Sequence, residues 1–240
     1  MKYTVPIFII LQGPSVKDLA ENIEYFKDSN VIWASLNSFW VVEPIIQSIG
    51  VEFSILYASS LEGGVSHLGV HICEFLQRPY RKLFISSQEF LTEFLREFYD
   101  YKNLRLDNLE NNDVITSLIA SGNLRYKGYP KMNSLTAMLL ILACRGYRKF
   151  YVFGCDGGYI PDREGLYYDG FQKAPGRKTS ISDLELDARV MNERFWSEME
   201  FIGLARKDVE IYNVSPHSRV ECLTKISMQE LIERREQHGL

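Results

Sequence analysis

Short hydrophobic runs alternate with amphipathic segments along most of the 240-residue chain. The runs predict six strands, at Thr4–Leu11, Val31–Leu36, Glu52–Tyr57, Lys82–Ser86, Lys149–Gly154 and Val209–Tyr212. Helical spacing predicts helices at Val16–Lys27, Val41–Ile49, Gln88–Phe98, Val114–Ala120, Ser134–Arg145, Leu184–Ile202 and Ser227–Gln237. Strands that are hydrophobic on both faces and alternate with helices are typical of a mainly parallel sheet covered on both sides. We therefore expect an α/β, Rossmann-like, doubly wound fold.

Two stretches depart from this alternation. Residues Asn103–Lys131 mix helical and loop patterns, and Gly157–Thr179 is rich in glycine, proline and charged residues. A loop as long as the second stretch is usually functional or disordered when it occurs in a compact domain. We expect a single Rossmann-like domain over residues 1–240, with a lid-like loop at 157–182.

The composition is that of a soluble globular protein, with 46% hydrophobic residues, 24% charged residues and a formal net charge of −4. Lys and Arg are spread along the chain, so no basic block indicates a nucleic-acid partner. The apolar N-terminal stretch is too short for a signal peptide, and no segment is long enough to span a bilayer. The cysteines lie in or beside hydrophobic runs without CxxC spacing, at Cys73, Cys144, Cys155 and Cys222. We expect buried thiols in a reducing compartment, and hence a cytoplasmic protein.

In a parallel sheet of this kind, ligands bind beyond the carboxyl ends of the strands, so the turns after the strands are the candidate sites. The first turn is Gln12-Gly13-Pro14-Ser15. Gly13 allows a ligand to approach the backbone, and Ser15 is a good N-cap for a helix whose free amides attract phosphate. The turn lacks the GxGxxG pattern, which disfavours a nicotinamide or flavin cofactor. A plain capped turn is the alternative interpretation.

Uncharged polar residues follow the next three strands. Asn37 comes after the second strand and can donate and accept hydrogen bonds at once, which suits a phosphate, a ribose or a base edge. Ser59 and Ser86 come after the third and fourth strands. Each residue alone is more typical of a turn or a helix cap. Together they predict a polar, uncharged cleft.

Asp156 follows the fifth strand, within the sequence Gly154-Cys155-Asp156-Gly157-Gly158. A carboxylate in this place suits a ribose hydroxyl or a metal ion, and a simple Asx turn is the third interpretation. A metal site needs a second carboxylate nearby, and the chain has no DxD pattern. We therefore favour a hydrogen-bonding role for Asp156 and expect no metal site.

Three motifs, taken in order, resemble known families: GPS after the first strand, SLNSF after the second, and NSLTAMLLILACRGYRKFYVFGCDGG around the fifth. The chain resembles the bacterial domain-of-unknown-function-115 family, which is also named after archaeal 6-hydroxymethylpterin diphosphokinase. That family includes motility accessory factors implicated in flagellin glycosylation. The motifs are also similar to those of the family 42 sialyltransferases of bacterial surface glycans.

The resemblance implies a nucleotide site at the strand ends. It places around the nucleotide or its sugar the residues Gly13, Pro14, Ser15, Asn37, Asn133, Ser134, Asp156, Asn213 and Ser215, with Gln12 standing where the sialyltransferases have Asn. Tyr159 and Tyr168 resemble the tyrosines that hydrogen-bond the departing phosphate. The catalytic histidine of the sialyltransferase loop has no counterpart in Pro175–Asp187. His217 therefore becomes the candidate base, with Asp183 and Asp187 as alternatives.

We expect a glycosyltransferase that uses a nucleotide-activated sugar, for example a CMP-linked one, in surface glycan or flagellin glycosylation. Its partners would be a nucleotide or nucleotide-sugar and a glycan or protein acceptor, with no cofactor. The related transferases often form homo-oligomers. Two alternatives stay open. One is a diphosphokinase that transfers from Mg²⁺-ATP to a small alcohol such as a pterin, and the other is a non-catalytic nucleotide-binding module.

Overall fold

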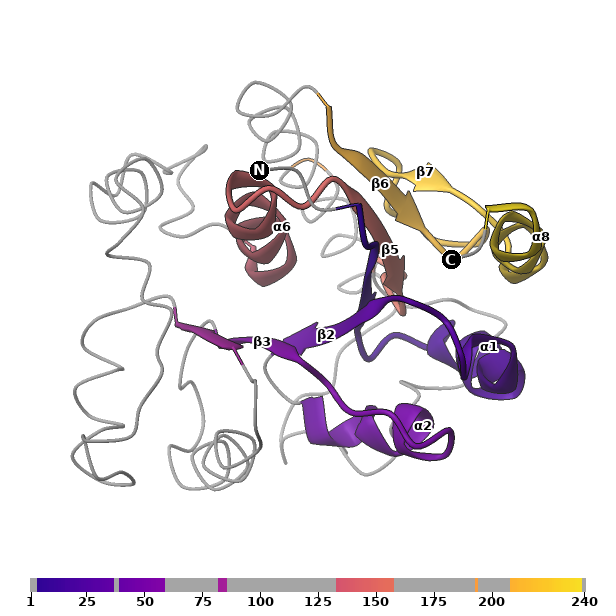
Figure 1. Ribbon diagram of the computed structural model, residues 1–240. Helices are drawn as coiled ribbons and strands as arrows, with labels where there is room; N and C mark the ends of the chain where they lie inside the picture. The colour runs from indigo at the N-terminus through magenta and orange to yellow at the C-terminus, as the bar shows by residue number, and fades with distance from the viewer. Residues whose placement is uncertain are drawn as a thin grey trace, which may run out of the picture.

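The protein is described by a computed structural model that covers residues 4–36, 39–58, 82–85, 133–157, 193 and 208–238. These residues form a seven-stranded sheet in the order β4-β3-β2-β1-β5-β6-β7 (Figure 1). The strands are β1 (Ile7–Ile10), β2 (Ile32–Leu36), β3 (Ile55–Ala58), β4 (Lys82–Ile85), β5 (Lys149–Phe153), β6 (Glu210–Asn213) and β7 (Thr224–Lys225). Every neighbouring pair in this sheet is parallel. The predicted α/β, Rossmann-like fold is confirmed.

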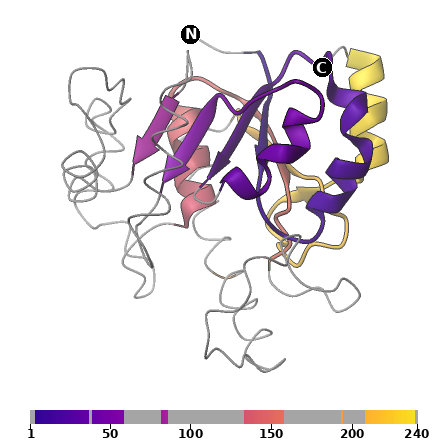
Figure 2. The same cartoon turned by 90° about the horizontal axis from the view of Figure 1, so that it is seen from below.

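Helices cover both faces of the sheet (Figures 1 and 2). One face packs against α1 (Val16–Asn22), η1 (Ile23–Phe26), η2 (Phe39–Val41), α2 (Glu43–Gln47) and α8 (Met228–His238), and the other packs against α6 (Ser134–Cys144). Successive side chains of β1 point to opposite faces of the sheet, so the strand contributes to both hydrophobic clusters. Phe8 and Ile10 join the α1 side, and Ile7 and Ile9 join the α6 side.

The centre of the α1 side is an aromatic cluster around Phe8. Its ring lies 5.2–5.4 Å, centroid to centroid, from those of Phe26, Trp33, Tyr151 and Phe153. All four residues of β1 are completely buried. A strand enclosed on both faces needs hydrophobic residues at every position, which is why IFII has no polar alternation.

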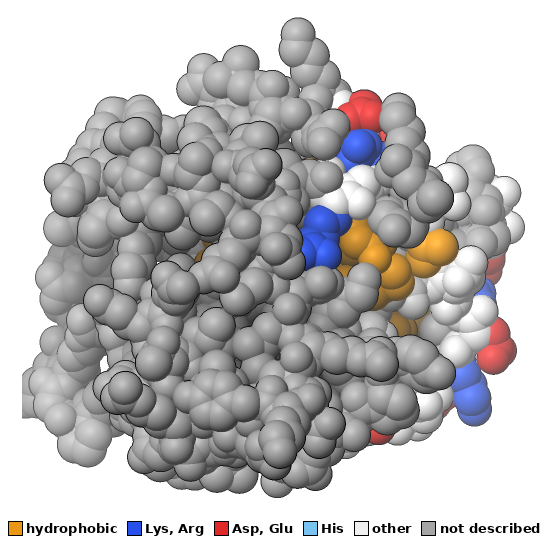
Figure 3. Space-filling view, turned by 60° about the vertical axis from the view of Figure 1, so that its left-hand side comes forward, with side chains coloured by type: hydrophobic (Ala, Val, Ile, Leu, Met, Phe, Trp, Pro, Cys, Tyr) orange, Lys and Arg blue, Asp and Glu red, His pale blue; other side chains and the backbone are white. Residues whose placement is uncertain are grey.

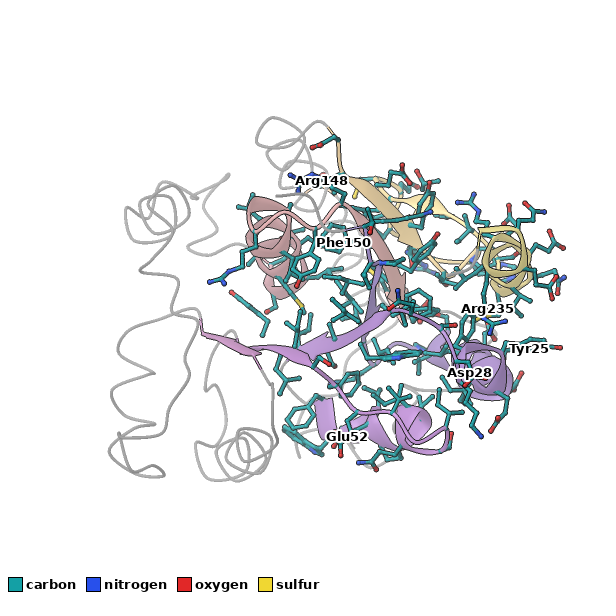
Figure 4. All side chains as sticks on the ribbon, in the orientation of Figure 1. Tyr25, Asp28, Glu52, Arg148, Phe150 and Arg235 are labelled. Carbon is teal, nitrogen blue, oxygen red and sulfur yellow. The ribbon has the colours of Figure 1, made fainter. Side chains whose placement is uncertain are left out.

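Helix α6 is hydrophobic around its whole circumference, and its described side chains from Leu135 to Ala143 are buried. Asn133 begins the helix, because its Oδ1 accepts a hydrogen bond from the Leu135 amide at 2.9 Å. Arg148 holds the other end, where its Nη1 donates to the carbonyls of Ala143 and Tyr147, each at 2.7 Å (Figure 4). Since α6 runs antiparallel to the strand that follows it, Asn133 lies toward the carboxyl edge of the sheet.

The described surface is mostly polar. Tyr25 is its one exposed large hydrophobic residue. On the face drawn in Figure 3, hydrophobic side chains of the described residues are visible in a small area beside Lys or Arg side chains. Arg235 of α8 reaches the α1 side of the molecule, where its Nε donates to Ser29 Oγ at 3.0 Å (Figure 4). Among the described residues, no helix combines the length and the hydrophobicity needed to cross a membrane.

The sequence predictions hold for most of the described elements, and four points differ. The two-residue strand β7 was not predicted, the predicted helix Val16–Lys27 is divided between α1 and η1, and the predicted helix Val41–Ile49 is divided between η2 and α2. Cys222 is only partly buried, against the expectation of a buried thiol. The predicted helices at Gln88–Phe98 and Val114–Ala120 lie outside the described residues, and so does the predicted helix Leu184–Ile202 apart from Glu193. So does the predicted lid-like loop, apart from its first residue.

Strands β1 and β5 are neighbours, but the chain leaves them in opposite directions across the sheet. After β1 it passes through α1 to β2, whereas β6 lies on the far side of β5. The carboxyl ends of β1 and β5 therefore form the topological switch point, the place at which doubly wound folds bind their ligands.

Candidate functional site at the switch point

One buried carboxylate joins the turns that follow β1, β5 and β6. The backbone amide of Ser15 donates to Asp156 Oδ2 at 2.8 Å, and the hydroxyl of Ser215 donates to Asp156 Oδ1 at 2.8 Å. Asp156 is only 3% exposed. Both carboxylate oxygens therefore accept a hydrogen bond from another turn, and the carboxylate links three segments that are far apart in sequence.

The turns after β1 and β5 are also joined backbone to backbone. The Leu11 amide donates to the Phe153 carbonyl at 2.8 Å, and the Gly13 amide donates to the Gly154 carbonyl at 3.0 Å. A Cβ atom on Gly13 would overlap the Gly154 carbonyl and the Asp156 carboxylate. We expected Gly13 to make room for a ligand, but in the structure it makes room for the neighbouring turn.

The amides at the start of α1 are all used within the protein. The Ser15 amide donates to Asp156, and the amides of Val16, Lys17 and Asp18 donate to the carbonyls of the β1–α1 turn at 3.0–3.2 Å. The expectation of free amides at this helix start was therefore wrong. The negative charge that a helix N-terminus favours comes from Asp156 itself.

Ser15 does not cap α1 with its side chain, contrary to the sequence-based expectation. Its backbone is already helical, with φ −66° and ψ −10°, whereas a capping serine usually has an extended backbone. Its hydroxyl is buried and has no hydrogen-bond partner. The side-chain acceptor at this helix start is Asp156, from the turn after β5. That the turn from Gln12 to Ser15 faces a nucleotide stays a prediction.

The turn after β6 is fastened to the turn after β5 at several points. Asn213 Nδ2 and Ser218 Oγ both donate to the Cys155 carbonyl, at 2.9 and 2.6 Å. The Arg219 amide donates to the Asp156 carbonyl at 2.9 Å. These bonds hold the segment 213–219 against the end of β5.

His217 is exposed on this fastened turn, while Ser215 and Ser218 on either side of it are 1% and 3% exposed. The two serines are buried because their hydroxyls donate to Asp156 and to the Cys155 carbonyl in the turn after β5. An imidazole thus lies accessible to solvent on a rigid support at the carboxyl edge of the sheet.

The Cys155 thiol lies in the same region, but it is not a candidate nucleophile. Its burial raises its pKa far above the ordinary value, and the nearby charges of Asp156 and Cys222 raise the pKa further. A thiol in this state stays protonated and unreactive. No group of three or more His, Cys, Asp or Glu side chains that could hold a metal occurs in the described part of the chain.

The structure brings one set of the predicted site residues into a single network, comprising Gly13, Ser15, Asp156, Asn213 and Ser215. Gln12 and Pro14 belong to the same β1–α1 turn, and Asn133 and Ser134 begin α6. A second set lies outside the described residues, namely Asn37, Ser59, Ser86, Tyr159 and Tyr168. Sequence reasoning did not single out Lys225, whose ammonium donates to the Ser218 carbonyl in this region, because its two-residue strand leaves no hydrophobic period to detect.

Comparison with known proteins supplies one match to a solved structure. No protein-family model matches the sequence, and no curated protein does. The fold is similar to that of the MAf glycosyltransferase from Magnetospirillum magneticum AMB-1, with a TM-score of 0.56 and 15% sequence identity. The match covers 99% of this chain but 36% of that chain. At this identity the likeness shows the fold, and the family resemblance drawn from the motifs stays a prediction.

Proposed function

We propose that the protein is a glycosyltransferase that takes a nucleotide-activated sugar as its donor. The observation that carries the proposal is the exposed His217, held on a turn that is fastened to the switch point of a Rossmann-like sheet. Doubly wound folds bind nucleotides beyond the strand ends at the switch point, and an imidazole on a turn fastened to that region would offer a base.

In this reaction the base removes the proton of the acceptor hydroxyl, and the hydroxyl oxygen attacks the anomeric carbon of the donor sugar. The bond from that carbon to the phosphate oxygen breaks, and the nucleotide leaves with the bonding electrons. His217 would take the proton, because imidazole is the side chain most often used as a general base. Tyr159 and Tyr168 would stabilise the leaving phosphate by hydrogen bonds.

The comparison supports the reaction class, since the similar solved structure is that of a glycosyltransferase. The donor, the acceptor and the place of action are proposals from the sequence resemblance. They are a donor such as a CMP-linked sugar, a glycan or protein acceptor, and a role in glycosylating flagellin or a surface glycan. A homo-oligomeric state is a further expectation of the same kind, and a cytoplasmic location is expected from the cysteine pattern.

A thermal-shift screen with CMP, UDP, GDP, ADP, ATP and CMP-sialic acid, each with and without Mg²⁺, tests whether a nucleotide binds. A ligand that binds only the folded state raises the melting temperature. We expect a shift with one nucleoside mono- or diphosphate that does not require Mg²⁺. A shift with Mg²⁺-ATP alone would contradict the proposal and point to a diphosphokinase.

The role of His217 is tested with the donor that the screen identifies, by following release of its nucleotide in the presence of candidate acceptors. Replacing a general base lowers the rate by roughly 100-fold or more. We expect His217→Gln to lower kcat by that factor while KM for the donor stays unchanged. His238→Gln, at the end of α8, is the matched control and should leave kcat unchanged. Donor binding without turnover in the wild type would instead indicate a non-catalytic module.

A further inference from the structure

We propose that the phosphate of the donor binds on the β6–β7 side of the switch point, with the Lys225 ammonium as its positively charged contact. The inference rests on the proposed nucleotide-sugar function and adds the residue that recognises the phosphate. It also excludes the β1–α1 turn, which is where doubly wound folds commonly hold a phosphate.

The β1–α1 turn is closed to anions by the protein's own carboxylate. Asp156 occupies the start of α1 through its bond to the Ser15 amide, and the next three amides donate to carbonyls of the turn. The space beside Gly13 is filled by the neighbouring turn. A phosphate here would meet a negative charge at close range and find none of these four amides available, so its binding is disfavoured.

The other side of the switch point offers a positive charge. Lys225 is the last residue of β7 and pairs in register with Asn213, the last residue of β6, so it lies at the carboxyl edge. Its ammonium donates to the Ser218 carbonyl. An ammonium has three N–H donors, and that bond uses one of them. Among the described residues, no carboxylate forms an ion pair with Lys225.

The bond to Ser218 ties this charge to the turn that carries the proposed base. Ser218 follows His217 directly, and its hydroxyl is tied to the Cys155 carbonyl at 2.6 Å. The ammonium is therefore held on the same rigid turn that carries the imidazole. One turn would then serve both ends of the reaction, because the ammonium faces the phosphate that becomes more negative as the sugar leaves it.

The experiment compares nucleotide and nucleoside affinities, since their ratio isolates the contribution of the phosphate. Isothermal titration with CMP and cytidine, and with the corresponding pair for any other base found to bind, is carried out on the wild type, Lys225→Met, Lys225→Arg and Lys17→Met. Lys17 is the matched control, because it is an exposed lysine in the first turn of α1, beside the rejected site.

We expect Lys225→Met to weaken nucleotide binding roughly ten-fold or more while the nucleoside affinity stays unchanged. Lys225→Arg should restore most of the loss, and Lys17→Met should have no effect. The unchanged nucleoside affinity shows that the variant site is still folded. If Lys17→Met weakens nucleotide binding and Lys225→Met does not, the phosphate lies at the β1–α1 turn and the inference is wrong, while the proposed function stands.

Inorganic pyrophosphate serves as a second probe that does not depend on the nucleotide. If no nucleotide binds but pyrophosphate stabilises the wild type and not Lys225→Met, the anion site is supported and the proposed donor class is wrong. If neither nucleotide nor pyrophosphate binds the wild type, both the inference and the proposed function are contradicted.

Discussion

Removing the Asp156 carboxylate is the perturbation that best tests the interpretation of the switch point. Asp156→Ala deletes two hydrogen bonds at once, one from the Ser15 amide and one from the Ser215 hydroxyl, each at 2.8 Å. Both donors lie in buried residues. The Ser15 amide cannot turn away to find another acceptor, because the start of α1 fixes its direction.

The expected loss of stability follows from these two bonds. A hydrogen bond to a charged group contributes about 1.5–3 kcal/mol, and an unsatisfied buried donor carries a desolvation penalty of similar size. We expect Asp156→Ala to lower the free energy of unfolding by about 3–5 kcal/mol, which is a large part of the roughly 5–15 kcal/mol of a typical domain. In Asp156→Asn, Oδ1 can accept from Ser15 while Nδ2 donates to Ser215 Oγ. We therefore expect that variant to lose only about 1 kcal/mol.

Urea unfolding followed by circular dichroism measures these differences, and a double-mutant cycle with Ser215→Ala isolates one of the two bonds. The coupling between the two positions should be about 0.5–3 kcal/mol if the bond contributes as proposed. A loss below about 0.5 kcal/mol for Asp156→Ala would refute the reasoning, since a surface substitution has an effect of that size. The same variants report on ligand binding, because Asp156→Asn leaves the turn intact while removing its charge.

Three further predictions follow from the described contacts. Gly13→Ala should destabilise the protein by about 3 kcal/mol or more, because the added Cβ would overlap fixed backbone atoms. Overpacking typically costs about 1–3 kcal/mol even where side chains can adjust, and a lower melting temperature would show the loss. Cys155 should resist iodoacetamide in the native protein and react only after unfolding, because burial raises its pKa. The partly exposed Cys222 should react before Cys155, and mass spectrometry of the labelled peptides checks this order. Arg234→Ala should cost about 1 kcal/mol in urea unfolding, because its guanidinium lies 4.6 Å from the ring centre of Tyr212, and Arg234→Lys should recover part of that loss.

The pattern of hydrophobic residues was enough to predict the fold class and the places of the strands. The run TVPIFIIL contains β1, and KFYVFG contains β5 within one residue of its end, because a strand buried on both faces has no alternative to an unbroken hydrophobic run. The same reasoning located the strand-end turns, since parallel strands all end at one edge of the sheet.

Within those turns, the sequence determined which residues are polar but not which partners they take. In sequence, Asp156 suited a metal, a ribose or a turn, with a hydrogen-bonding role favoured. The partners that it takes in the structure are Ser15, which is 141 positions away, and Ser215, which is 59 positions away. Gly13 was expected to admit a ligand, yet the neighbouring β5 turn occupies that space. No sequence pattern indicated Lys225, because its strand has only two residues and shows no hydrophobic periodicity.

The sequence by itself thus determined the order of elements, the two-sided burial of the sheet and the edge at which a site would form, since these follow from local periodicity. Only the tertiary structure decided that the β1–α1 turn is closed by an internal carboxylate and that the turn with His217 is fixed to β5. The physical reason is that hydrogen-bond partners in a doubly wound sheet come from strands that are adjacent in space and distant in sequence. Their pairing depends on chain topology, which no local pattern encodes.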